Sequence, residues 1–135
     1  MIVFDENIHQ QSLMKSVATW YRGQVVSITM LRPGTLIQDE VIPTLLQQAN
    51  EATFVTNNVS DFWQKVLAHQ NYCIICISLP NNRLYEISGL LRRLFLLPKF
   101  RTKAARMGKV VRASHQRVQY YQVNGNRLTT FEWQA

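Results

Sequence analysis

The feature that most constrains the fold is a series of four short apolar runs, each followed by a segment with helical spacing. The runs are rich in β-branched residues: "MIVF" (1–4), "QVVSITM" (24–30), "TFVT" (53–56) and "YCIICISL" (72–79). Buried strands that alternate with amphipathic helices are typical of βαβ units. We therefore expect an α/β fold with three layers, α/β/α, around a mostly parallel sheet of about four strands.

The segments between and after these runs predict four helices: 8–21, 38–50, 60–71 and 82–97. Pro43 is tolerated in the first turn of the second helix, and Ser60 or Asp61 is the expected N-cap of the third. Pro98 is expected to end the fourth. Together with the apolar runs, these helices define residues 1–98 as an α/β domain.

The remaining residues, 99–135, break the alternation. Three strands are predicted there, "KVVRAS" (109–114), "RVQYYQV" (117–123) and "RLTTFEW" (127–133), and the Asn-Gly of "NGN" (124–126) favours a tight hairpin turn between the last two. We interpret residues 99–135 as a basic linker and a C-terminal β-hairpin or meander extension that packs on the same domain.

Basic charge is concentrated in the C-terminal third. The chain has 15 Lys or Arg and 8 Asp or Glu, yet no acid lies between Ile87 and Phe131. Such a block favours binding of phosphate backbones, and that binding should weaken steeply with salt. The alternatives are a solvated face and a site for an acidic partner protein. The candidate nucleic-acid-binding residues are Arg92, Arg93, Lys99, Arg101, Lys103, Arg106, Lys109, Arg112 and Arg117.

Apolar runs far shorter than the roughly 20 residues of a bilayer span indicate a soluble protein with no membrane partner. The acidic start "MIVFDENIHQ" is unlike a signal peptide, so we expect a cytoplasmic location. Cys73 and Cys76 lie in one predicted strand, where residues three apart point to opposite faces. They are expected to be core cysteines rather than ligands of one metal ion.

Five of the acids lie at strand ends or at a helix start: Asp5 and Glu6 after the first strand, Asp39 and Glu40 at the second helix, and Asp61 after the third strand. A parallel sheet brings its carboxyl ends to one edge. Carboxylates gathered there repel one another unless a cation or a shared proton holds them together. Mg²⁺ or Mn²⁺ would satisfy that need with oxygen ligands. The alternative is that these residues are ordinary helix caps and loop residues.

Three of these segments resemble a known family. "MIVFDEN" (1–7) is similar to the opening strand and first aspartate of the PIN-like nucleases, and "FVTNNVSDF" (54–62) to the segment after their third strand. "QDEVIPTLLQQA" (38–49) resembles the intervening helix start in small PIN-like proteins related to toxins of toxin–antitoxin pairs. The resemblance covers residues 1 to about 97 and leaves out the basic β tail.

The resemblance implies a metal-dependent endoribonuclease that uses Mg or Mn and cleaves RNA. Asp5 would be the first metal ligand, Asp39 or Glu40 the acid from the helix start, and Asp61 a ligand or water-orienting acid. Glu6 and Asn58 would complete the metal set. The Thr56 hydroxyl would help to order the loop, the alternative being that Thr56 is there for its β propensity alone. An antitoxin protein and a second copy of the chain, as a homodimer, are the partners to be expected.

Asn58 departs from the family pattern, because many relatives keep an additional acid near this position. An amide is a neutral and poorer ligand, so the metal would bind more weakly or the site would be inactive. The alternative function is therefore a catalytically weak or inactive PIN-like fold. It would act as a nucleic-acid-binding or protein-interaction module through its basic C-terminal segment.

Overall fold

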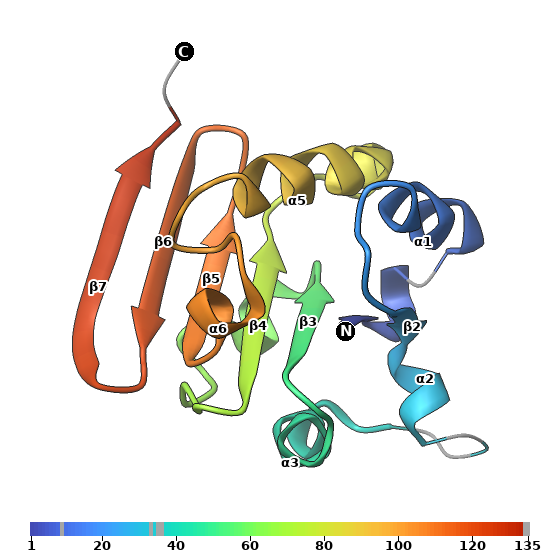
Figure 1. Ribbon diagram of the computed structural model, residues 1–135, viewed down its shortest axis with the longest axis horizontal. Coiled ribbons are helices and arrows are strands. Elements are labelled where there is room, and N and C mark those ends of the chain that lie inside the picture. Colours follow the sequence, from blue (N-terminus) through green and yellow to red (C-terminus); the bar gives the residue numbers. More distant parts are fainter. Residues whose placement is uncertain (9, 33, 35–36, 134–135) are drawn as a thin grey trace.

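A single seven-stranded sheet organises the computed structural model, which describes residues 1–8, 10–32, 34 and 37–133. The strands are β1 (Ile2–Phe4), β2 (Val25–Ser27), β3 (Ala52–Thr56), β4 (Tyr72–Ile77), β5 (Lys109–Ala113), β6 (Arg117–Gln122) and β7 (Gly125–Glu132). Their order is β2-β1-β3-β4-β5-β6-β7, with β2 and β7 at the two edges (Figure 1). The first five strands are parallel, and β6 and β7 continue the sheet in antiparallel fashion.

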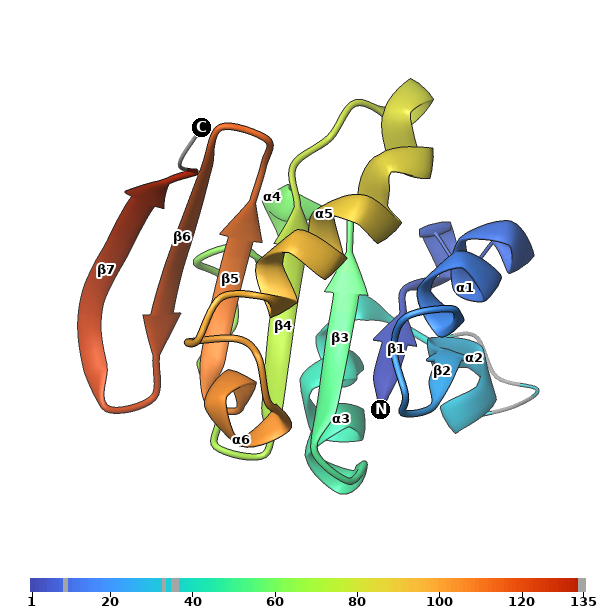
Figure 2. The same cartoon turned by 45° about the horizontal axis from the view of Figure 1, so that its top comes forward.

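Helices cover both faces of this sheet. In Figure 2, α1 (Gln11–Ala18) and α5 (Ile87–Phe95) lie in front of the strands, while α3 (Ile42–Gln48) and α4 (Val59–Phe62) lie behind them. Each pair buries its own apolar cluster against the sheet. The predicted α/β fold with a mostly parallel sheet is thus confirmed. We refer to the two sides as the α1/α5 face and the α3/α4 face.

The central strand β4 is buried along its whole length. Its side chains alternate between the two apolar clusters, with Cys73 on the α1/α5 face and Cys76 on the α3/α4 face. Burial raises the pKa of both thiols to about 12. The prediction of two core cysteines on opposite faces is confirmed.

The predicted number of about four parallel strands is wrong, because residues 109–113 do not belong to a separate extension. They form β5, which pairs in parallel with β4. Gly108 has a φ of 85° and leads from the short helix α6 (Lys103–Arg106) into this strand, a backbone conformation that glycine adopts without a Cβ penalty. The expected antiparallel hairpin is present, but its loop is Val123–Asn124, and Gly125 already pairs with Gln122.

Several elements are shorter than predicted or are preceded by 3₁₀ turns. β2 ends at Ser27 because this side chain accepts from the Thr29 backbone N–H and caps α2 (Ile28–Leu31). A 3₁₀ turn, Asn81–Glu86, precedes α5, and Arg83 within it has non-helical backbone angles. Two further 3₁₀ turns, Glu6–Ile8 and Asp39–Val41, precede α1 and α3. His9, inside the first predicted helix, lies outside the described residues.

The strand order fixes where a ligand site is expected. The strands β2 and β3 lie on either side of β1, so the connections after β1 and after β2 leave in opposite directions. In open α/β sheets such a switch point opens a crevice at the carboxyl ends of the strands. Here the crevice lies beyond β1 and β3, where the chain places Asp5 and the Asn57–Asp61 segment.

Candidate functional site

Asp5 occupies the end of β1 and is 3% exposed. Its backbone N–H donates to the Val55 carbonyl over 2.9 Å, and its Oδ2 accepts a hydrogen bond of 2.6 Å from the Thr56 hydroxyl. The same hydroxyl oxygen accepts from the Asn58 backbone N–H over 3.0 Å. Thr56 therefore joins the end of β1 to the loop after β3, the ordering role that the resemblance implied.

Asn58 links the two other aspartates. Its amide nitrogen donates to Asp61 Oδ2 over 2.7 Å and to Asp39 Oδ2 over 3.4 Å. Its Oδ1 accepts from the Asp61 backbone N–H and caps α4, so the predicted N-cap at Ser60 or Asp61 is wrong. The helix α4 is a single turn, because Trp63 after it is extended and Gln64 has a left-handed φ of 58°.

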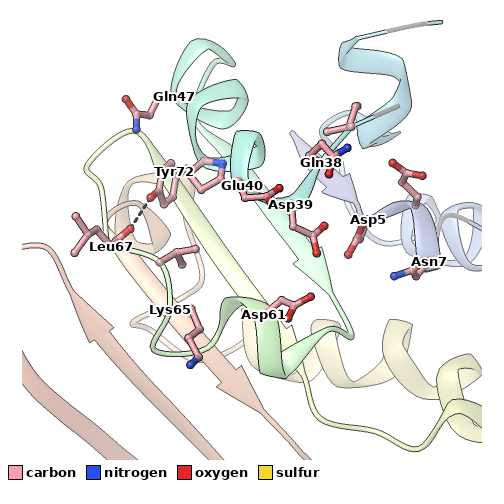
Figure 3. A pocket seen from close by; sticks show the side chains of 14 residues that line it. Asp5, Asn7, Gln38, Asp39, Glu40, Gln47, Asp61, Lys65, Leu67 and Tyr72 are labelled. Carbon is pink, nitrogen blue, oxygen red and sulfur yellow. Dashed lines mark hydrogen bonds between the residues drawn. The ribbon is translucent and has the colours of Figure 1, made fainter. Parts of the chain in front are cut away.

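The three aspartates meet in an open groove of about 840 Å³, which we call the acidic groove. Figure 3 shows the carboxyl groups of Asp5, Asp39 and Asp61 pointing toward one another, although they come from three separate segments of the chain. The groove continues between α3 and the segment after α4 toward the amino end of β4. Its polar lining also includes Glu6, Asn7, Gln38, Glu40, Gln47 and Lys65.

The electrostatics of the acidic groove are most visible at Asp39. Partial burial, followed by the charges of Asp5 and Asp61, a hydrogen bond with Asp61 and the charge of Glu40, raises the pKa of this carboxyl to about 6. An acid whose pKa lies near neutrality can hold a proton or release one under ordinary conditions. The cluster is thus suited to sharing a proton or to binding a cation.

We expect Asp39→Asn to stabilise the metal-free protein above pH 6 by about 1 kcal/mol, a value reduced for solvent screening of a partly exposed group. The folded-state pKa of about 6 lies above the ordinary 3.8, so the folded state binds the proton more tightly than the unfolded state. The destabilisation by the Asp39 charge is therefore complete above pH 6 and disappears as the pH falls to about 4. Urea unfolding at pH 4 and pH 7.5 measures the difference, and an equal effect at both values would contradict it.

The predicted metal ligands lie near one another but do not form a complete coordination site. Among residues 1–8, 10–32, 34 and 37–133, no three His, Cys, Asp or Glu side chains are arranged to hold a metal ion. Asp5, Glu6, Asp39, Glu40 and Asp61 nevertheless line one groove, with Asn58 bridging two of them. Mg²⁺ commonly keeps several waters and takes only one or two carboxylates, so this donor set fits a hydrated ion in an open site.

Sequence reasoning missed Lys65, which brings a positive charge to the lining of the acidic groove. It follows α4 in a stretch without regular structure, and nothing in the sequence separates it from a surface lysine. Gln38 and Gln47, from either end of the α3 segment, were missed for the same reason.

The basic residues predicted to bind nucleic acid are divided among several places. Arg92, Arg101 and Lys103 line a groove on the α1/α5 face. The side-chain nitrogens of Lys99 and Lys109 lie 5.5 and 5.9 Å from the centroid of the Tyr120 ring. These residues do not share a surface with the acidic groove, whose buried lining residues Ile37 and Tyr72 belong to the cluster on the α3/α4 face.

Only part of the basic segment lies toward the acidic side. Arg112 alternates along β5 with residues of the α1/α5 cluster and therefore points to the α3/α4 face. With Arg117 and Gln119 it lines a pocket of about 390 Å³ near the carboxyl ends of β4 and β5. Arg93 instead lies against Trp133, with its guanidinium carbon 4.3 Å from the ring centroid.

Arg106 was predicted together with exposed basic residues, but its side chain is buried and only 2% exposed. Its guanidinium donates to the Thr53 hydroxyl and to the carbonyl oxygens of Phe100 and Arg101. It also packs on the Phe95 ring at 4.2 Å from the centroid. Arg106 therefore holds the 100–106 segment on the sheet.

Comparison of the chain with protein-family models, with curated proteins and with solved structures finds no match. Within the described ranges, no helix has the length and apolar character that crossing a bilayer requires.

Proposed function

We propose that the protein is a metal-dependent endoribonuclease of PIN-like type that acts as the toxin of a toxin–antitoxin pair. The observation that carries the proposal is the convergence of Asp5, Asp39 and Asp61 in one open groove at the switch point of the sheet. Like charges from three chain segments repel one another, and a bound cation offsets that cost. A cleft at the strand ends with a perturbed carboxyl is a common setting for catalysis.

Each side chain has a role that follows from its surroundings. Asp5 is fixed by the Thr56 hydroxyl and by its own backbone hydrogen bond, so it offers a rigid carboxylate. Asp61, held by the Asn58 amide, faces the groove and is exposed. Asp39, with its raised pKa, is suited to accept a proton from the attacking water. When bound, a divalent cation neutralises phosphate charge and activates water against a phosphodiester.

Cleavage of a labelled single-stranded RNA tests the proposal directly. We expect internal cuts with Mg²⁺ or Mn²⁺ and none when EDTA removes the metal. Cleavage that continues in EDTA would contradict the metal requirement. Growth arrest on expression, relieved by a co-expressed antitoxin candidate, tests the toxin role separately. That role, its antitoxin partner and a homodimer rest on the resemblance alone.

The second candidate function is an inactive PIN-like fold that binds nucleic acid or protein through its basic residues. The observation that favours it is the neutral Asn58 amide, which donates hydrogen bonds to two carboxylates at the centre of the cluster. These bonds lower the repulsion among the acids without a metal. Binding of RNA without cleavage, under every metal tested, would support this candidate.

Asn58→Asp is expected to tighten Mg²⁺ binding about tenfold, which corresponds to about 1.4 kcal/mol. The change replaces an amide donor with a carboxylate ligand, and it adds repulsion that only a cation relieves. The Mg²⁺-dependent rise of the thermal unfolding midpoint measures the effect without any activity assay. Asn57→Asp is the matched control, since it adds the same charge one residue away. An equal rise in both variants would show that Asn58 does not face the ion.

A further inference from the structure

A second groove, of about 600 Å³, lies on the α1/α5 face of the sheet. It forms where the connection between α1 and β2 meets α5 and the segment around α6. Five of its ten lining residues are Arg or Lys and none is acidic, and its aromatic residues Trp20, Tyr21 and Phe95 belong to the α1/α5 cluster. We call it the basic groove, defined by Trp20, Arg22, Arg92, Arg101, Lys103 and Arg106.

The floor of the basic groove is the buried Arg106. Its guanidinium donates to two carbonyl oxygens and the Thr53 hydroxyl at 2.9 to 3.2 Å, and it also makes a hydrogen bond with Tyr21. Within the part of the chain that the structure describes, no carboxylate lies within ion-pair distance of this guanidinium. Burial lowers the pKa of Arg106, as expected for a charge that has lost water without gaining a counter-ion.

Four more cations surround this buried charge: Arg22, Arg92, Arg101 and Lys103. Among the described residues, Lys103 is the one of these four with an ion pair, its Nζ lying 4.0 Å from a Glu51 carboxylate oxygen. Gathering positive groups around a buried guanidinium costs free energy, because each charge repels the others where solvent screens them incompletely. A bound anion would turn this cost into attraction, and guanidinium groups match phosphate oxygens in geometry.

The wall of the basic groove is aromatic. Trp20 packs edge-on against Phe95 and Tyr21, and its indole N–H donates to the Ser88 hydroxyl over 3.0 Å. The hydrogen bond fixes the ring, which stays partly exposed beside the cations. Positive charge next to fixed aromatic rings is the combination that holds a phosphate together with a stacked base.

We propose that the basic groove binds the phosphate group of a nucleotide unit, either free or within an RNA strand, with the base against the Trp20 wall. The site lies on the opposite face of the sheet from the acidic groove, so it does not depend on the nuclease function. It also explains why most of the basic segment lies away from the acids.

The test compares two triple variants in EDTA, where no metal-dependent cleavage occurs. The groove variant is Arg22→Ala with Arg101→Ala and Lys103→Ala. The control variant is Lys15→Ala with Arg32→Ala and Arg127→Ala, which removes the same charge from exposed positions outside the groove. Thermal unfolding checks that both variants stay folded. Calorimetry then measures binding of adenosine 5′-monophosphate, inorganic phosphate, adenosine, an oligoadenylate and an oligoglutamate.

We expect the wild type to bind adenosine 5′-monophosphate more tightly than inorganic phosphate or adenosine. The groove variant should lose at least tenfold in affinity for the monophosphate, and the control variant less than twofold. If the oligoadenylate binds more tightly than the monophosphate, the groove recognises phosphate within an RNA strand. If the two affinities are equal, the groove recognises a free nucleotide. Equal losses in both variants would reduce the effect to net charge and overturn the site. Binding of oligoglutamate alone would overturn the proposal and identify the groove as a surface for an acidic protein. The absence of binding by every ligand would overturn it as well.

Discussion

Asp61→Asn is expected to lower Mg²⁺-dependent RNA cleavage at least a hundredfold, a loss of about 2.7 kcal/mol in transition-state stabilisation. The substitution keeps the size of the side chain and its place beside Asn58, but removes the exposed carboxylate that faces the groove. Protein stability should stay the same or rise slightly, because one of the charges that raise the pKa of Asp39 is gone.

Glu132→Gln is the matched control for Asp61→Asn. Glu132 is exposed at the end of β7, the edge strand at the opposite end of the sheet from β2 and β1. Its replacement changes the net charge by the same amount as Asp61→Asn. Cleavage by this variant should equal that of the wild type. If Asp61→Asn and Glu132→Gln cleave equally, the activity belongs to another site or to a contaminant.

The position of the acids could be predicted because it follows from chain order and sheet geometry. Asp5 follows β1 directly and Asp61 lies in the single-turn helix α4 shortly after β3, and parallel pairing of β1 with β3 brings those strand ends together whatever the side chains do. What the sequence could not predict is the hydrogen-bond network. The amide of Asn58 donates to acids that are 3 and 19 positions away, a choice of rotamer that depends on the packing of α3 and α4.

A strand was predicted at residues 109–114, but its parallel pairing with β4 was not, for a different reason. The two strands that follow residues 109–113 form an antiparallel meander, and the sequence grouped all three strands together. The pairing of β5 with β4 instead depends on the 96–108 segment, which crosses the α1/α5 face without a long helix. Arg106 holds this segment on the sheet, although the sequence grouped it with the exposed basic residues.

Arg106→Ala is expected to lower the free energy of unfolding by about 3 kcal/mol. The substitution leaves the Phe100 and Arg101 carbonyls and the Thr53 hydroxyl without their donor, and buried polar groups in that state cost about 1–3 kcal/mol each. Loss of packing on the Phe95 ring adds to the cost. Relief of the buried charge acts in the opposite direction, which keeps the total below the sum of the parts.

Two further substitutions separate these contributions. Lys103→Ala removes an exposed cation from the same helix and should change the free energy of unfolding by less than about 0.5 kcal/mol. Arg106→Met keeps most of the volume and removes the charge, so it should cost less than Arg106→Ala. Urea unfolding of the three variants at one pH gives the comparison. Equal free energies of unfolding for Arg106→Ala and Lys103→Ala would mean that Arg106 does not anchor the 100–106 segment. Its side chain would then be free to move and contact a ligand.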